Sequence, residues 1–286
     1  MDSKKNLIKN KVDKVAVFGA NGFIGRSFCK FLELNNCDFI AISKSKENKY
    51  LYKNYFSLNL ENDDIWSPEL LEKIKKYKKV VFLSAIVQKK NVDVMKINLK
   101  IFNNFMLNIK KFKNTHSVLF ISSKDIKFLR KSYARNASSF QISYAKSKKI
   151  CEELLTSQTD LKNKILRLPI VFSEENRVNV RKRYCFSIKK LKIYFKILPA
   201  PFYEVVSTDE LNPIFLKELN FDIKSSKNFL NFKKKSQHEL LLKESKFYIP
   251  IPRFLLYFLF LLLNFFPLKI ARSKAINFDK LINFTN

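Results

Sequence analysis

The glycines of this 286-residue chain constrain its fold most, because all three lie within seven residues, at Gly19, Gly22 and Gly25. At an average usage of roughly 7%, a chain of this length would hold about twenty glycines. Glycine adopts backbone conformations and permits close approaches that other residues do not. A chain that otherwise does without glycine therefore requires it at this one place.

The glycine cluster lies between an apolar run at 14–18, typical of a short strand, and residues 23–34, whose apolar positions have helical spacing. A strand, a glycine-rich turn and a helix form the arrangement that binds the pyrophosphate of a dinucleotide. The first glycine allows the tight turn, the second lets the backbone approach phosphate, and the third lets the helix pack against the strand. The cofactor contacts predicted here are Gly19, Gly22, Phe23, Ile24 and Gly25.

Strands and helices alternate along the first two-thirds of the chain. Further strands are expected at 38–42, 55–58, 80–84, 118–122 and 165–168, and further helices at 92–112 and 144–155. Such alternation predicts an α/β fold, a Rossmann-type doubly wound parallel sheet covered on both faces. After Pro169 the pattern becomes irregular. We therefore expect a dinucleotide-binding domain over 1–169 and a smaller C-terminal substrate lobe over 170–286.

The chain is strongly basic, with a net charge of +30 from 55 Lys and Arg against 25 Asp and Glu. Lysine is spread along the chain, and its excess accompanies abundant Asn, Ile and Phe, which is the profile of an AT-rich coding sequence. A nucleic-acid-binding protein more often gathers its basic residues in one patch. We therefore expect no nucleic acid partner, and contact with an anionic membrane surface stays open.

The four cysteines form no CxxC motif, and only two histidines could join them. A metal site is therefore not expected. The first residues of the sequence lack the apolar core of a signal peptide. A reducing, cytoplasmic location is expected.

An apolar segment, 254–266, is too short to span a bilayer as a helix. One interpretation is a helix that packs within the C-terminal lobe or across a homodimer. The other is a helix that lies in the membrane interface at the inner face of the membrane, with Lys269 and Arg272 meeting lipid phosphates. The sequence favours neither.

The glycine spacing is GxxGxxG, and Tyr144 and Lys148 form a Tyr-x-x-x-Lys motif. Together they resemble the extended short-chain dehydrogenase/reductase family, of the NAD-dependent epimerase/dehydratase type that acts on nucleotide sugars. One helical turn separates Tyr144 from Lys148, which places both on one helix face. The Lys148 ammonium would lower the pKa of the Tyr144 phenol, which would then exchange a proton with the sugar. The resemblance also assigns Ser123 as the hydroxyl that polarises the reacting oxygen.

The same resemblance assigns the remaining cofactor contacts. It implies that Asn59 and Leu60 touch the adenine, that Ser84 and Ala85 run beneath the cofactor, and that Asn98 supports the site. It also implies that Pro169 borders the nicotinamide, and that Tyr144 and Lys148 touch the cofactor as well as catalyse. At the end of the second strand, Ser43 and Lys44 stand where an NAD site has an acidic residue, which would suit a 2′-phosphate. The cofactor expected is NAD or NADP.

Two departures from the family pattern leave the substrate open. The family's Asn-Val-Tyr-Gly is replaced by residues 170–173, Ile-Val-Phe-Ser, and Asp125 is one position away from the acidic residue of a dehydratase. The resemblance implies an NAD(P)-dependent epimerase, 4-keto reductase or dehydratase for a nucleotide sugar, in bacterial surface polysaccharide synthesis. The alternative is a non-catalytic dinucleotide-binding scaffold attached to a membrane or a complex.

Overall fold

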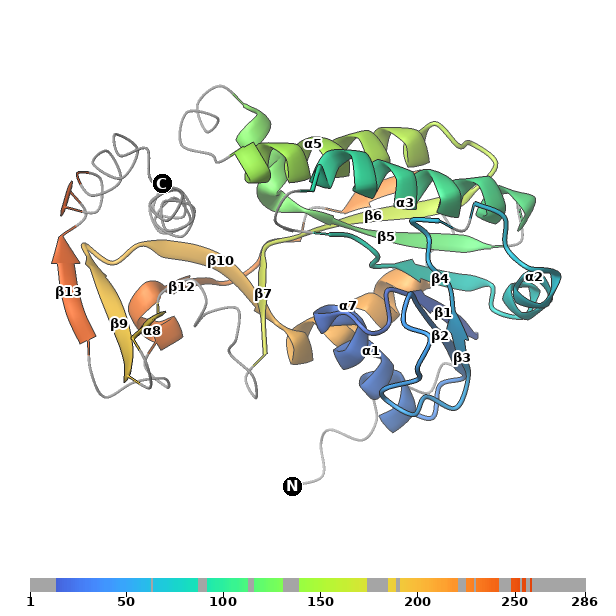
Figure 1. Cartoon of the computed structure of the whole chain (residues 1–286), viewed down its shortest axis with the longest axis horizontal. Coiled ribbons are helices and arrows are strands. Elements are labelled where there is room, and N and C mark those ends of the chain that lie inside the picture. Colours follow the sequence, from blue (N-terminus) through green and yellow to red (C-terminus); the bar gives the residue numbers. More distant parts are fainter. Residues whose placement is uncertain are drawn as a thin grey trace. The chain divides into compact units, whose positions relative to one another are not determined.

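The largest sheet of the computed structural model has seven strands in the order β11-β6-β5-β4-β1-β2-β3 (Figure 1). Its strands are β1 (Val15–Phe18), β2 (Phe39–Ser43), β3 (Tyr55–Ser57), β4 (Lys79–Phe82), β5 (Ser117–Ser123), β6 (Lys162–Leu168) and β11 (Ser225–Asn228). β1 pairs in parallel with both β2 and β4. The order 3-2-1-4-5-6 is that of a Rossmann fold, so the expected fold class is confirmed.

The structure describes part of the chain. It comprises residues 14–62, 64–86, 92–112, 116–130, 139–173, 185–188, 191–220, 225–228, 230–241, 248–252, 254–255 and 258.

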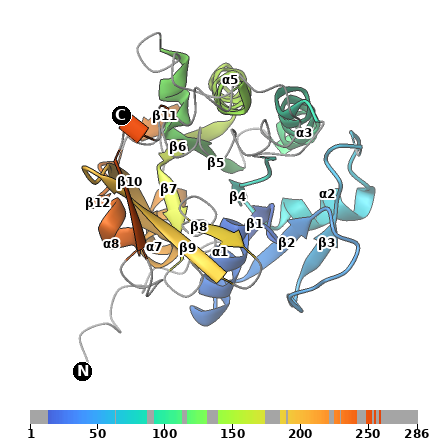
Figure 2. The same ribbon diagram turned by 60° about the vertical axis from the view of Figure 1, so that its left-hand side comes forward.

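Helices cover both faces of the large sheet (Figures 1 and 2). They are α1 (Phe23–Leu34), α2 (Pro68–Lys75), α3 (Val94–Ile109) with the short 3-10 turn η1 (Lys110–Phe112), α5 (Ser139–Thr156) and α7 (Thr208–Leu219). α3 and α5 lie over one face, and α1 and α7 lie over the other. α7 packs beside α1, where Asn212 Nδ2 donates to Ser27 Oγ at 3.0 Å.

The core of this sheet is aromatic. The side chains of Phe18 on β1 and Phe82 on β4 are almost fully buried, as is that of Phe105 on α3. The ring centroids of Phe82 and Phe105 are 4.4 Å apart, and Phe18 stacks on Trp66 at 5.3 Å. Each such ring removes a large apolar area from water, which ties α3 to the centre of the sheet.

The six strands expected from the sequence all exist, as do α1, α3 and α5. α2 was not expected, because it has eight residues and buries only Leu70 and Ile74. Its start does carry local signals: Pro68 occupies the first turn, and the hydroxyl of Ser67 accepts from the Leu70 amide at 3.3 Å. These are ordinary helix-starting features.

Two compact units make up the chain. The first holds the residues up to Ser123, then Lys146–Arg167 and Thr208–Leu230; the second holds Lys124–Ala145, Leu168–Ser207 and the residues from Asn231 onward. A single boundary at residue 169 does not separate these two units, because the chain returns to the first unit for α7 and β11. It returns because α7 buries Leu211, Phe215 and Leu219 completely within that unit.

The second unit contains two small sheets, ordered β12-β10-β7 and β13-β9-β8. Its elements are η2 (Lys124–Leu129), β7 (Ile170–Phe172), β8 (Cys185–Ile188), β9 (Leu191–Leu198), β10 (Phe202–Ser207), β12 (Lys234–Ser236), α8 (Gln237–Leu241) and β13 (Tyr248–Pro252). Gln237 joins the two sheets. Its side-chain oxygen accepts from the Ile197 amide at 2.8 Å, and its backbone amide donates to the Pro201 carbonyl.

The apolar segment at 254–266 lies largely outside the described residues, as do Lys269 and Arg272. Three of its members are described, Phe254, Leu255 and Phe258, and all three are exposed. Among the helices within the described ranges, none combines the length and the hydropathy that crossing a bilayer requires.

Candidate functional site

A pocket of about 630 Å³ lies in the first unit at the carboxyl ends of β1, β2 and β4. The strand order reverses between β1 and β4, and open parallel sheets bind ligands at such a switch point. Eight residues predicted as cofactor contacts line it: Gly19, Gly22, Ser43, Lys44, Asn59, Leu60, Ser84 and Ala85. Their positions agree with a cofactor pocket, and their contacts with a cofactor stay a prediction.

Each glycine of the turn meets a different structural requirement. Gly19 has a φ of +87°, and a Cβ there would lie 2.9 Å from the Ser84 nitrogen. A Cβ at Gly25 would lie 2.2 Å from the Gly19 carbonyl oxygen, so only glycine lets α1 pack against the turn. Gly22 faces the pocket and begins α1 without a side-chain cap. The first amides of α1, which include those of Phe23 and Ile24, lack partners from within the helix.

Asn21 is a pocket residue that the sequence analysis missed. Both polar atoms of its side-chain amide are buried, and neither has a hydrogen-bond partner among the described residues. A buried amide without partners is costly and calls for a ligand or water. Its position between Gly19 and Gly22 is the signal that could have found it. An unpartnered amide beside an uncapped helix N-terminus fits the pyrophosphate of a dinucleotide.

Three buried asparagines of α3 hold backbone segments in place, and two of these segments, at Leu60 and Ile86, line the pocket. Asn98 accepts from the Ile86 amide at 2.7 Å and donates to the Ile86 carbonyl at 2.8 Å. Asn104 donates to the Leu60 carbonyl at 2.8 Å, and Asn108 to the Asp64 carbonyl at 2.7 Å. Asn98 was expected to support the site. The other two were missed, although amides four residues apart on an otherwise apolar helix face indicate buried hydrogen bonds.

Tyr144 and Lys148 lie one turn apart on α5. Lys148 is almost fully buried: its Nζ donates to the Ile121 carbonyl at 2.8 Å and lies 4.8 Å from the centre of the Phe120 ring. Burial lowers the pKa of Lys148 to about 8, although nearby Cys151 and Glu152 act in the opposite direction. Ser123 ends β5 two residues beyond Ile121. Lys148 thus lies against the strand that ends at the predicted polarising serine.

Pro169, Tyr144 and Lys148 are not among the residues that line the pocket. Pro169 lies between β6 and β7, where its side chain is partly exposed. Phe23, Ile24 and Gly25 also lie outside the lining. Gly25 serves the packing of α1, and the contacts of the Phe23 and Ile24 backbone amides with a cofactor stay a prediction. The catalytic assignments stay proposals.

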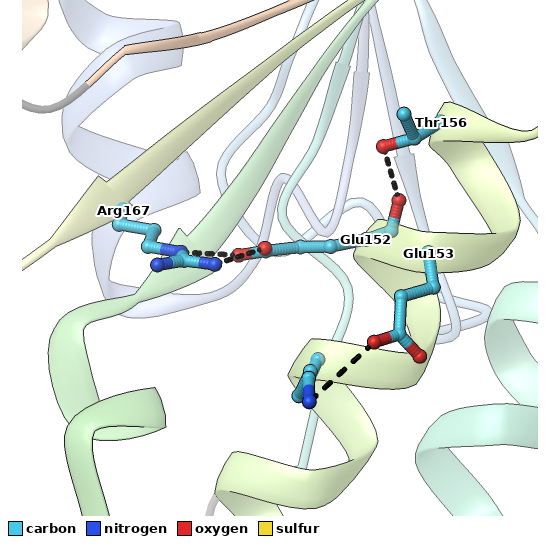
Figure 3. A network of polar contacts seen from close by, with 5 residues as sticks. Glu152, Glu153, Thr156 and Arg167 are labelled. Atoms are coloured by element: carbon cyan, nitrogen blue, oxygen red, sulfur yellow. Dashed lines mark hydrogen bonds and ion pairs between the residues drawn. The ribbon is translucent and has the colours of Figure 1, made fainter. Parts of the chain in front are cut away.

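An ion pair between the buried Glu152 carboxylate and the partly buried Arg167 guanidinium anchors α5 to β6 (Figure 3). Arg167 donates from Nε and Nη2 to the two carboxylate oxygens of Glu152, at 2.8 and 2.6 Å. The Glu152 side chain is 1% exposed. The Lys149–Glu153 pair on the same helix is more than half exposed at both partners, with 3.6 Å between Nζ and Oε1. A two-pronged buried pair holds its partners in one geometry, so Glu152 fixes the helix one turn after Lys148.

The parallel sheet, the glycine turn and the pocket at the switch point define a Rossmann-type dinucleotide-binding protein. More particularly, the chain belongs to the NAD dependent epimerase/dehydratase family, whose model matches residues 15–190. No curated protein resembles the sequence closely enough to count as a match.

Solved structures of similar fold cover most of the chain. ADP-L-glycero-D-manno-heptose-6-epimerase of Helicobacter pylori is 17% identical, with a TM-score of 0.63 over 86% of this chain and 87% of that one. UDP-glucose 4-epimerase of Thermus thermophilus, in complex with NAD, is 15% identical (TM-score 0.61; 84% and 86%). dTDP-glucose 4,6-dehydratase of Bacillus anthracis, also with NAD, is 13% identical (TM-score 0.57; 84% of each chain). At such identities the likeness shows the shared fold.

Replacing Gly22 by valine is expected to raise the Kd of the dinucleotide by about a hundredfold or more, since at least two hydrogen bonds to a charged group, roughly 1.5–3 kcal/mol each, would be lost. The new side chain would occupy the place where the backbone meets pyrophosphate. Isothermal titration with NAD and NADP measures the change. The control is Lys30→Val, the same side chain at an exposed position of α1. Unchanged affinity in Gly22→Val would contradict the site assignment.

Proposed function

We propose that this chain is an enzyme that moves hydride between a nicotinamide and a sugar carbon of a nucleotide sugar. The observation that carries the proposal is Lys148, buried against β5 on the helix face that also bears Tyr144. A buried cation one turn from a tyrosine is costly for folding and useful for acid–base chemistry. Family membership and the pocket at the switch point support the same function.

The dinucleotide, when bound, would accept hydride from the sugar and return it. Asn21, Gly22 and the first amides of α1 would hold its pyrophosphate. Asn59 and Leu60 would hold its adenine end, and Ser84 and Ala85 would lie beneath its other half, toward Pro169. The Ile86 segment that Asn98 clamps would keep this wall in place.

The protein's own residues would carry the proton. The Tyr144 phenol would take a proton from a sugar hydroxyl or return it to a carbonyl. Lys148 would be charged at neutral pH, because the pKa of its amine, about 8, lies above 7. Its charge would favour the phenolate of Tyr144, and the burial of Lys148 would keep that effect weakly screened. Ser123 would donate a hydrogen bond to the reacting oxygen.

Epimerisation or 4-keto reduction is favoured over dehydration. A dehydratase of this type would use an acidic residue near Ser123, and Asp125 on η2 stands one position off that pattern. The similar structures are of enzymes named for sugars linked to ADP, UDP and dTDP, and these nucleotides set the range of substrates to try. Bacterial surface polysaccharide synthesis would consume such products.

The location and assembly proposed rest on the sequence. We place the protein in the cytoplasm, with its basic C-terminal region able to meet the inner face of an anionic membrane. Phe254, Leu255 and Phe258 are exposed, which suits contact with lipid or with a second copy of the chain.

The test is conversion of a panel of UDP-, dTDP-, ADP- and GDP-sugars by the purified full chain, with NAD or NADP for epimerisation or dehydration, and with NADH or NADPH and the corresponding 4-keto sugars for reduction. Mass spectrometry and proton NMR separate the outcomes: an epimer keeps its mass, a reduced product gains two hydrogens, and a dehydrated product loses one water. We expect an epimer or a reduced product. Tight dinucleotide binding with no conversion of any sugar would favour the non-catalytic scaffold instead.

A further inference from the structure

The end of β2 carries no carboxylate. A dinucleotide site that prefers NAD places Asp or Glu here, where it accepts hydrogen bonds from the ribose hydroxyls. In this chain β2 ends at Ser43 and continues with Lys44. The Ser43 hydroxyl is itself occupied, since it lies 3.0 Å from the Tyr55 hydroxyl and accepts from the Ser45 amide at 3.3 Å. The carboxylate that accepts from both ribose hydroxyls in an NAD site is therefore missing at this position.

Cations surround this end of the pocket. Lys44, Lys49 and Tyr50 all line it. The Arg26 guanidinium donates to the Tyr50 hydroxyl at 2.8 Å and lies 5.1 Å from the centre of its ring. Tyr50, which lines the pocket, thereby holds the positive charge of Arg26 at the rim.

Glu61 is the one acidic side chain among the pocket-lining residues that the structure describes. Its carboxylate lies 3.5 Å from Lys44 Nζ, which is longer than a good charge-assisted hydrogen bond. The segment that bears Glu61 is fixed, because Asn104 holds the preceding carbonyl, that of Leu60. Glu61 thus keeps Lys44 at the pocket with a contact weak enough to give way to a stronger anion.

We propose that this end of the pocket is a subsite for a ribose 2′-phosphate, and that the chain prefers NADP(H) to NAD(H). Lys44 is the residue that discriminates, with Lys49 beside it and Arg26 at the rim. A phosphate with nearly two negative charges offers Lys44 a better partner than the singly charged Glu61 carboxylate at 3.5 Å. The inference rests on the proposed dinucleotide site and departs from the similar epimerase and dehydratase whose structures hold NAD.

Isothermal titration of the full chain with NADP, NAD, 2′,5′-ADP and 5′-AMP tests the subsite. NADP is expected to bind about tenfold tighter than NAD, and 2′,5′-ADP about tenfold tighter than 5′-AMP, as one charge-assisted contact implies. Added salt should weaken the binding of NADP more than that of NAD, and the binding of 2′,5′-ADP more than that of 5′-AMP. If inorganic phosphate weakens the binding of 2′,5′-ADP and not that of 5′-AMP, the difference in affinity arises at the 2′-phosphate.

Lys44→Ala should raise the Kd of NADP about tenfold and leave that of NAD nearly unchanged. Glu61→Gln should tighten NADP, since Lys44 would lose its competing partner. Lys46→Ala is the matched control, an exposed lysine of the same turn that does not line the pocket. Equal affinities for the two dinucleotides, or equal losses for both in Lys44→Ala, would overturn the subsite alone. A folded chain that binds neither dinucleotide would instead overturn the proposed function.

Discussion

Replacing Tyr144 by phenylalanine is expected to lower kcat by about 10²–10⁴-fold, the range that a positioned proton-transfer group supplies. The substitution removes one hydroxyl and keeps the ring, so the packing of α5 and the Kd of the dinucleotide should stay close to those of the parent. Single-turnover kinetics on the substrate found in the panel measure the first quantity, and titration measures the second.

Tyr77→Phe is the control for this experiment. It removes a hydroxyl that donates to Asp38 at 3.4 Å, just before β4 and thus at the opposite end of the strand from the pocket. Its kcat should match the parent. Lys148→Ala should damage both turnover and dinucleotide binding, because Lys148 is proposed to serve both. Near-parental turnover in Tyr144→Phe would refute the proposed acid–base role.

Arg167→Met is expected to lower the free energy of unfolding by about 3–5 kcal/mol, the cost of leaving a buried charge without its partner. Glu152 has a 1% exposed side chain, and both of its carboxylate oxygens bind Arg167 (Figure 3). Methionine fills a similar volume, so lost packing contributes little. Urea unfolding followed by circular dichroism measures the change.

Two variants separate charge from packing. Lys149→Met breaks the exposed pair with Glu153 on the same helix, and such pairs contribute at most about 1 kcal/mol. The double variant Arg167→Met, Glu152→Leu also removes the buried carboxylate and should recover much of the lost stability. A single Arg167→Met variant that unfolds like Lys149→Met would show that the buried pair does not anchor α5.

The order of strands and helices in the first unit could be read from the sequence, because it depends on local patterns. Short runs of Val, Ile and Phe bounded by polar residues predict buried strands, and helical spacing predicts α1. The glycine turn was readable for the same reason: Gly19 requires a positive φ, and Gly25 a close approach six residues away. The sequence does not predict α2, because two buried residues are too few to show a helical spacing.

The pocket could be predicted in part. Ser43, Asn59 and Ser84 follow three different strands, and the ends of parallel strands meet at one edge of a sheet, so knowing the topology brings them together. Lys49 and Tyr50 lie in a loop without periodic pattern, and nothing local in the sequence indicates that the loop folds back over the pocket.

The sequence by itself determined the class of fold, the glycine turn and the spacing of Tyr144 and Lys148, all of which depend on residues close together in the chain. Only the tertiary structure decided that α7 returns to the first unit, that Asn104 clamps Leu60, and that Glu152 pairs with Arg167. The physical reason is that burial and hydrogen bonding between distant residues depend on how whole elements pack. Hydrophobic periodicity records which face of an element is buried, and does not record its partner.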